Sequence, residues 1–125
     1  MGEQPVEDEF AGGLGFRFGS PGEVSMTLAP EHVNGIGKML GPVGFALVDY
    51  AMTTAAAAGI GDDELAVTVN VAINFVAAAD RGEVHCTARL RRRTRTIASL
   101  AAAVRDDEER LLIDAVGTFA IVPRR

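Results

Sequence analysis

The segment from Leu40 to Ala58 constrains the fold more than any other part of this chain of 125 residues. Its apolar residues recur at helical spacing, and it ends in four alanines, which are strong helix formers. Pro42 suits the first turn of a helix, and Gly59 is a natural helix stop. Asp49 is the only charged residue in the segment. A helix of about 28 Å with one charge must be covered by protein on most sides.

The chain after this helix is predicted to supply the cover as β-sheet. Apolar and polar residues alternate with a period of two, which is typical of strands. The predicted strands after the helix span residues 65–75, 83–93, 96–104 and 111–122, and shorter ones precede it at 14–18 and 23–29. Because short turns join the late strands, we expect them to be antiparallel neighbours. The patterns therefore predict an α+β fold, a curved antiparallel sheet wrapped around one long central helix.

Length and composition narrow the class of protein. One domain is predicted over residues 1–125, with residues 1–13 as a loose acidic leader. No apolar run reaches the roughly 18 residues of a membrane span, and the acidic start lacks the features of a secretion signal. One cysteine and two histidines show no metal-ligand spacing, and a net charge of -5 argues against binding nucleic acid. We expect a cytoplasmic protein with no metal, no cofactor, and no membrane or nucleic-acid partner.

A run of residues before and inside the helix is more specific. It contains His32, Asn34 and Gly37 in a polar loop, then Gly41, and then Asp49 inside the helix. This run and the layout of the chain resemble the PaaI-like branch of the hotdog-fold acyl-CoA thioesterases. Members of that branch carry the pattern H-x-N-x-x-G-x-x-H-G-G-x-x-x-x-L-x-D. The similarity covers roughly residues 20–122, and the spacing from Asn34 to Asp49 is its most telling part.

The resemblance implies an enzyme that hydrolyses an acyl- or aryl-CoA thioester to the free acid and CoA. It implies a homodimer or a dimer of dimers, with each site shared between two chains. Asp49 would act as general base or as nucleophile, and the Gly41 backbone N–H would bind the oxyanion. Asn34 would position the water or the thioester carbonyl. Thr68 matches a hydroxyl position that assists in some members.

Two residues depart from the family pattern and support a second reading. Leu40 stands where the family usually has histidine, and Pro42 stands where it usually has a second glycine. Leucine makes the site drier, and proline has no N–H to give to an oxyanion. The alternative is an acyl-CoA-binding or structural hotdog subunit that does not hydrolyse its ligand. In that case Asp49 would be a solvated or hydrogen-bonded residue near a helix start.

A basic block on the strand predicted at residues 83–93 is a second candidate site. Arg89, Arg91 and Arg93 occupy alternate positions, so a regular strand would place them on one face. Such a row of guanidinium groups could hold the phosphates of CoA through charge-assisted hydrogen bonds. The alternative is a solvated sheet face that balances the acidic turns.

Overall fold

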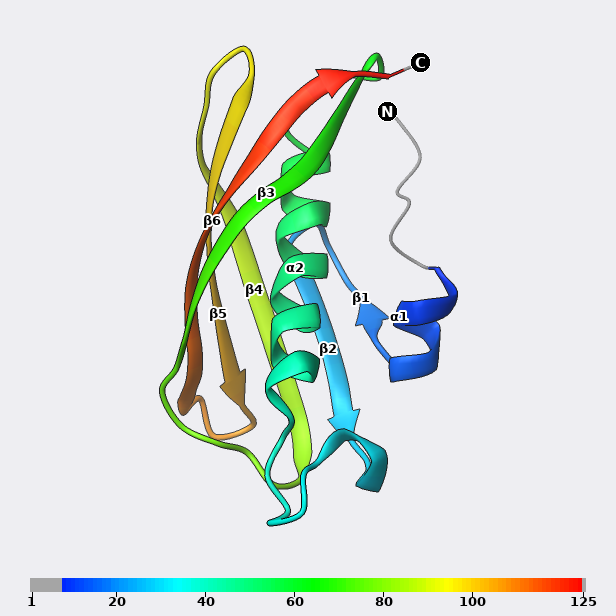
Figure 1. Cartoon of the computed structure of the whole chain (residues 1–125), viewed down its shortest axis with the longest axis vertical. Helices are drawn as coiled ribbons and strands as arrows, with labels where there is room; N and C mark the ends of the chain where they lie inside the picture. Colours follow the sequence, from blue (N-terminus) through cyan, green and yellow to red (C-terminus); the bar gives the residue numbers. More distant parts are fainter. Residues whose placement is uncertain (1–7, 125) are drawn as a thin grey trace.

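The computed structural model describes residues 8–124, which form one curled antiparallel sheet around one long helix. Its elements are α1 (Glu9–Leu14), β1 (Arg17–Phe18), β2 (Glu23–Leu28), the 3-10 helix η1 (Pro30–His32), α2 (Gly41–Ala57), β3 (Glu64–Phe75), β4 (Gly82–Arg93), β5 (Ile97–Asp106) and β6 (Leu111–Pro123). Figure 1 shows α2 lying along the hollow of the sheet. The predicted α+β fold is confirmed.

The order of the strands corrects one expectation. Within residues 8–124 the sheet has six strands in the order β1-β2-β4-β5-β6-β3. The short turns predict that the four late strands are neighbours in chain order, which holds for β4, β5 and β6 but is wrong for β3. β3 pairs with β6, because β2 occupies the other edge of β4. Residues 76–81 therefore cross from the sheet edge to its interior, and the outer side of β3 is left as an edge.

The core lies between α2 and the concave face of the sheet. Leu47 and Met52 of α2 are fully buried, and so are Leu100 of β5 and Phe119 of β6. Burial of each such side chain contributes roughly 1.5–3 kcal/mol. Gly117 of β6 is a point of close approach, since a Cβ there would lie 2.6 Å from the Met52 sulfur. The sheet thus packs closely against the buried face of α2.

The structure describes only part of the predicted acidic leader. Residues 1–7 lie outside the described residues, whereas α1 occupies part of the predicted leader. Asp8 caps this helix by accepting a hydrogen bond of 2.9 Å from the Ala11 N–H, and Gly15 ends it with φ of 78°. No helix within residues 8–124 is long and apolar enough to cross a membrane.

Candidate active site

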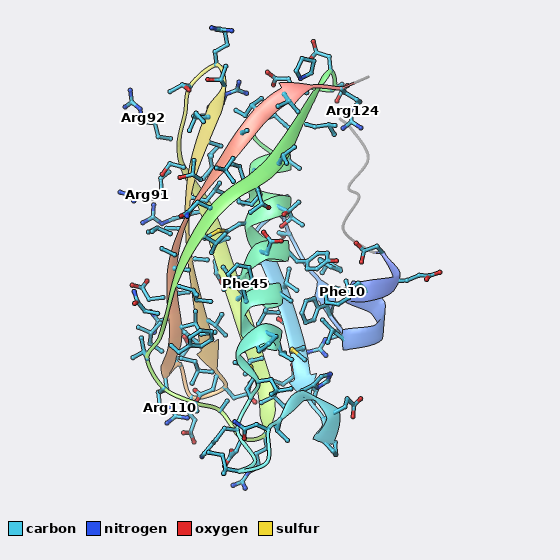
Figure 2. The ribbon with its side chains drawn as sticks, in the orientation of Figure 1. Phe10, Phe45, Arg91, Arg92, Arg110 and Arg124 are labelled. Atoms are coloured by element: carbon cyan, nitrogen blue, oxygen red, sulfur yellow. The ribbon has the colours of Figure 1, made fainter. Side chains whose placement is uncertain are left out.

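An apolar cavity of about 650 Å³ lies beside the first turns of α2. Its lining comes from α1, α2 and the end of β3, and consists of Phe10, Gly41, Pro42, Phe45, Ala46, Asp49, Tyr50 and Phe75. Figure 2 shows Phe45 on α2 and Phe10 between α1 and α2. Asp49 is the only acidic side chain in this lining, so the cavity combines one carboxyl group with apolar surroundings.

Asp49 and Thr68 lie side by side, one on α2 and the other on β3. The Thr68 hydroxyl on β3 donates a hydrogen bond of 2.9 Å to Asp49 Oδ1. The pairing of β3 with β6 shifts between Thr68 and Asn70, so a bulge follows the threonine directly. The second carboxylate oxygen, Oδ2, has no donor within residues 8–124. Asp49 is therefore fixed through one oxygen and can act as a base or nucleophile through the other.

Gly41 places an unpaired N–H at the cavity. It is the first residue of α2, and Leu40 before it provides no side-chain cap. The N–H groups of Val43 and Gly44 both donate to the Leu40 carbonyl, and Pro42 has no N–H. The Gly41 N–H has no acceptor within residues 8–124. The positive end of the helix dipole and one free donor therefore meet in the cavity wall, as an oxyanion site requires.

Gly41 and Asp49 lie far apart along α2. Both line the cavity, but Asp49 comes eight positions after Gly41, a rise of about 12 Å along the helix axis. A reacting carbonyl must lie within about 3 Å of both its oxyanion donor and its attacking group. One thioester cannot meet both conditions against a single copy of α2.

Asn34 lies in the loop before α2 and is not part of the cavity lining. Its side-chain oxygen accepts hydrogen bonds of 3.0 Å from the N–H groups of Ile36 and Lys38. Its own N–H donates to the Lys38 carbonyl at 2.8 Å. The carboxamide oxygen is thus used to shape the loop, and only the side-chain N–H₂ can serve a ligand. The structure does not bring Asn34 to Asp49 within one chain.

The arginine row is interrupted, which corrects the expectation that Arg89, Arg91 and Arg93 share one face. The pairing of β4 with β5 shifts between Leu90 and Arg92, so alternation breaks at this bulge. Arg93 turns toward the end of α2 and donates to the Gly59 carbonyl at 3.3 Å.

Arg93 also forms an ion pair of 3.2 Å with Glu64. Hydrogen bonding from Arg93 holds the pKa of the Glu64 carboxyl below its usual range. Arg89 and Arg91 remain exposed, and Figure 2 shows Arg91 and Arg92 pointing away from the sheet. Regular alternation along the strand would place Arg92 on the face opposite Arg89 and Arg91, so it does not predict that Arg92 is exposed with them.

Sequence reasoning missed the aromatic side of the cavity. The Tyr50 hydroxyl donates to both carboxylate oxygens of Asp8, at 2.9 Å each. Burial, followed by the hydrogen bond to Asp8, raises the pKa of Tyr50 to about 12. Phe10 stacks on the Tyr50 ring with the centroids 6.3 Å apart. Two features of the sequence could have indicated this cluster. Asp8 is a residue type that caps helices, and Tyr50, the only tyrosine of the chain, directly follows Asp49.

Comparisons with known proteins identify the family and the fold. A family model described as the thioesterase superfamily matches residues 36–113. The conserved protein PA5202 from Pseudomonas aeruginosa is 30% identical, with a TM-score of 0.85 over 94% of this chain and 96% of that chain. No curated protein matches the sequence.

Two more distant structures share the fold. The PaaI protein of the E. coli phenylacetic acid degradation operon is 21% identical, with a TM-score of 0.85 over 93% of this chain and 86% of that chain. BH2602 from Bacillus halodurans, solved with CoA, is 18% identical, with a TM-score of 0.86 over 90% and 75% of the two chains. The architecture is the expected hotdog fold.

Proposed function

The chain belongs to the thioesterase superfamily, and from this premise we propose that it hydrolyses an acyl- or aryl-CoA thioester to the free acid and CoA. The observation that carries the proposal is the apolar cavity, whose wall holds both a helix N-terminus with a free N–H and a carboxylate. The apolar lining suits the acyl group. The N–H of Gly41 suits the oxyanion, and Asp49 suits the activation of water.

The proposed reaction uses Asp49 through its unpaired oxygen. Asp49 Oδ2 takes a proton from water while the water oxygen attacks the thioester carbonyl carbon. The carbonyl oxygen becomes an oxyanion, to which the Gly41 N–H of the other copy of the chain donates. When the intermediate collapses, the C–S bond breaks and the CoA thiolate takes up the proton. In the alternative course Asp49 itself attacks, CoA leaves, and water then hydrolyses the mixed anhydride.

We propose that the site is shared by two copies of the chain, which the distance between Gly41 and Asp49 supports. β3 is an edge strand of 12 residues, with Val67 and Val69 exposed by 48% and 61%. An exposed apolar edge is a template for pairing with another strand. Antiparallel pairing of β3 with its copy would run the two α2 helices in opposite directions. One chain's Gly41 would then face the other chain's Asp49, in a homodimer or in each half of a dimer of dimers.

Arg89 and Arg91 are the arginines that we propose for the phosphates of CoA. Both are exposed, and neither has a partner within the described part of the chain, whereas Arg93 is committed to Glu64. Guanidinium groups bind phosphate through charge-assisted, often bidentate hydrogen bonds. The solved complex of BH2602 with CoA supports a CoA ligand for this fold.

Replacing Arg91 with alanine should raise KM for an acyl-CoA by about three- to tenfold, because one charged contact to phosphate is lost. The effect should shrink as salt is added, since exposed charges are screened. Arg110→Ala is the matched control, because Arg110 is exposed but pairs with Asp106. Steady-state kinetics at two ionic strengths provide the measurement. If KM changes equally in both variants, or does not change in Arg91→Ala, then Arg91 is a solvated surface residue that does not bind CoA.

A second candidate function has one observation in its favour. Pro42 supplies no N–H, so the first turn of α2 has a single oxyanion donor, and Leu40 adds no polar side chain. A site of this kind could bind an acyl-CoA without hydrolysing it. Asn34 bears on both functions, because its side-chain N–H₂ could hold the thioester carbonyl or the water in place.

The two functions are separated by offering the purified protein a panel of acyl- and aryl-CoA thioesters while free thiol release is followed. We expect turnover, with the highest kcat/KM for acyl groups that fit the cavity of about 650 Å³. Calorimetric titration with the same compounds reports binding alone. If the whole panel binds without thiol release, the protein is not a thioesterase, and the second candidate function, a non-hydrolysing acyl-CoA-binding subunit, takes its place.

A further inference from the structure

We propose that Phe10 is a specificity-determining residue that closes one side of the apolar cavity and limits the acyl group to compact chains. The Asp8–Tyr50 hydrogen bonds hold it in place. The inference rests on the proposed function, because it concerns the acyl group of that same site. It assigns a role to α1, which neither the catalytic residues nor the family match includes.

The position of α1 depends on contacts outside the helix. It has six residues, and two of them are the adjacent Gly12 and Gly13. Each glycine disfavours a helix by about 1 kcal/mol relative to alanine. Nothing lies within 4 Å of a Cβ built at either glycine, so packing does not require them. A helix this weak takes its place from the groups that dock it on α2.

Asp8 is the first of these docking groups. Its carboxylate caps α1 through the Ala11 N–H and also accepts the Tyr50 hydroxyl from α2. One side chain therefore joins the two helices. Hydrogen bonding from Ala11, followed by that from Tyr50, lowers the pKa of Asp8. A carboxylate with a lowered pKa keeps its stabilising contribution above its usual titration range, and loses it only as the pH falls through the lowered value.

The Tyr50 ring is the second docking group. Phe10 stacks on it, and the edges of Phe16 and Phe18 contact it with centroid distances of 5.7 and 6.2 Å. Tyr50 itself lines the cavity. The stacking of Phe10 on Tyr50 thus fixes where Phe10 lies relative to the cavity wall.

Phe10 itself is 63% exposed although it lines an apolar cavity. In the same helix Ala11 is fully buried, so α1 packs through Ala11 and leaves much of the Phe10 ring exposed. Figure 2 shows the ring between α1 and α2, beside the helix that carries Asp49. An acyl group that fills the cavity would cover this surface, and a longer chain would have to displace the ring.

Phe10→Ala tests the assignment through the ratio of kcat/KM for a long-chain to a short-chain acyl-CoA. Removing the ring should raise this ratio about tenfold, because steric exclusion of extra methylenes is worth that order. Phe18→Ala is the matched control, since Phe18 also contacts Tyr50 but does not line the cavity. Tyr50→Phe keeps the ring and removes the hydroxyl, and should raise the ratio less.

A second measurement uses Tyr50 as the only tyrosine of a chain that has no tryptophan. Titration of tyrosinate absorbance should give an apparent pKa of about 12 in the native protein. In Asp8→Asn the pKa should fall toward that of free tyrosine, because the charge beside the hydroxyl is lost while asparagine still caps α1. Because the pKa of Tyr50 is raised on folding, its protonated hydroxyl stabilises the protein fully at pH values below the pKa of an unfolded tyrosine. This stabilisation is lost as the pH rises toward 12.

The outcomes separate this inference from the proposed function. An active enzyme whose chain-length ratio is unchanged by Phe10→Ala would overturn the role of Phe10 and leave thioester hydrolysis intact. An unchanged Tyr50 titration in Asp8→Asn would overturn the positioning by Asp8. If the protein binds thioesters without turnover, the same ratio is taken from dissociation constants. If the protein neither binds nor hydrolyses any thioester, the proposed function itself is refuted, and with it the specificity that Phe10 is proposed to set.

Discussion

Replacing Asp49 with asparagine should lower kcat for thioester hydrolysis by about a thousandfold, because a positioned base or nucleophile contributes on that order. Asparagine has the same shape, and its side-chain oxygen can still accept the Thr68 hydrogen bond. It cannot take a proton from water or form an anhydride. Acyl-CoA binding should therefore persist while turnover is lost, measured by thiol release at saturating substrate and by calorimetry.

Thr68→Val is the control that separates orientation from chemistry. It removes the hydroxyl that fixes Asp49 Oδ1 but leaves the carboxylate in place. We expect a loss of about tenfold in kcat, because the attacking group is present but less well oriented. If Asp49→Asn retained the activity of the native protein, Asp49 would be an ordinary helix residue beside a cavity.

The two chemical roles of Asp49 differ in the order of product release. A nucleophilic Asp49 would release CoA before the acid, so a rapid-mixing experiment would show a burst of thiol equal to the number of sites. A general base would release both products together. The burst therefore assigns the role once the loss in Asp49→Asn is established.

Local sequence patterns predicted the elements of this fold better than their pairing. The helix from Gly41 to Ala57 and the four late strands follow from periodicity, which depends on neighbours in sequence. The place of β3 beside β6 depends on which strand reaches β4 first, and no turn length encodes that. The bulge that turns Arg93 toward Glu64 is likewise set by a partner strand. Long-range competition, and not local propensity, accounts for both errors.

The same division applies to the candidate site. Gly41 and Asp49 could be found because one short stretch of sequence contains both, together with the loop before them. Phe10 could not be found in this way, since Asp8 and Tyr50 are 42 residues apart and only the fold brings them together. Asn34 shows the opposite limit, because a matching position in sequence did not reveal that its oxygen shapes the loop.

Gly41→Pro should reduce kcat by about a hundred- to a thousandfold, the usual cost of one lost oxyanion donor. Proline removes the N–H and is well tolerated at the first position of a helix. Gly41→Ala is the matched control, because it keeps the N–H. Its Cβ would lie 3.7 Å from the Phe75 ring, an ordinary contact. Circular dichroism and thermal unfolding of both variants establish that α2 still forms.

Mixed dimers of these variants test whether the site is shared between chains. If Gly41 of one chain works with Asp49 of the other, a dimer of a Gly41→Pro chain and an Asp49→Asn chain keeps one intact site. Such dimers, isolated with two affinity tags, should recover about half of the native activity, since one site of two is complete. A dimer of a native chain and a chain with both substitutions should be inactive, because each site then lacks one group. A site contained within one chain would give the reverse result in both pairings.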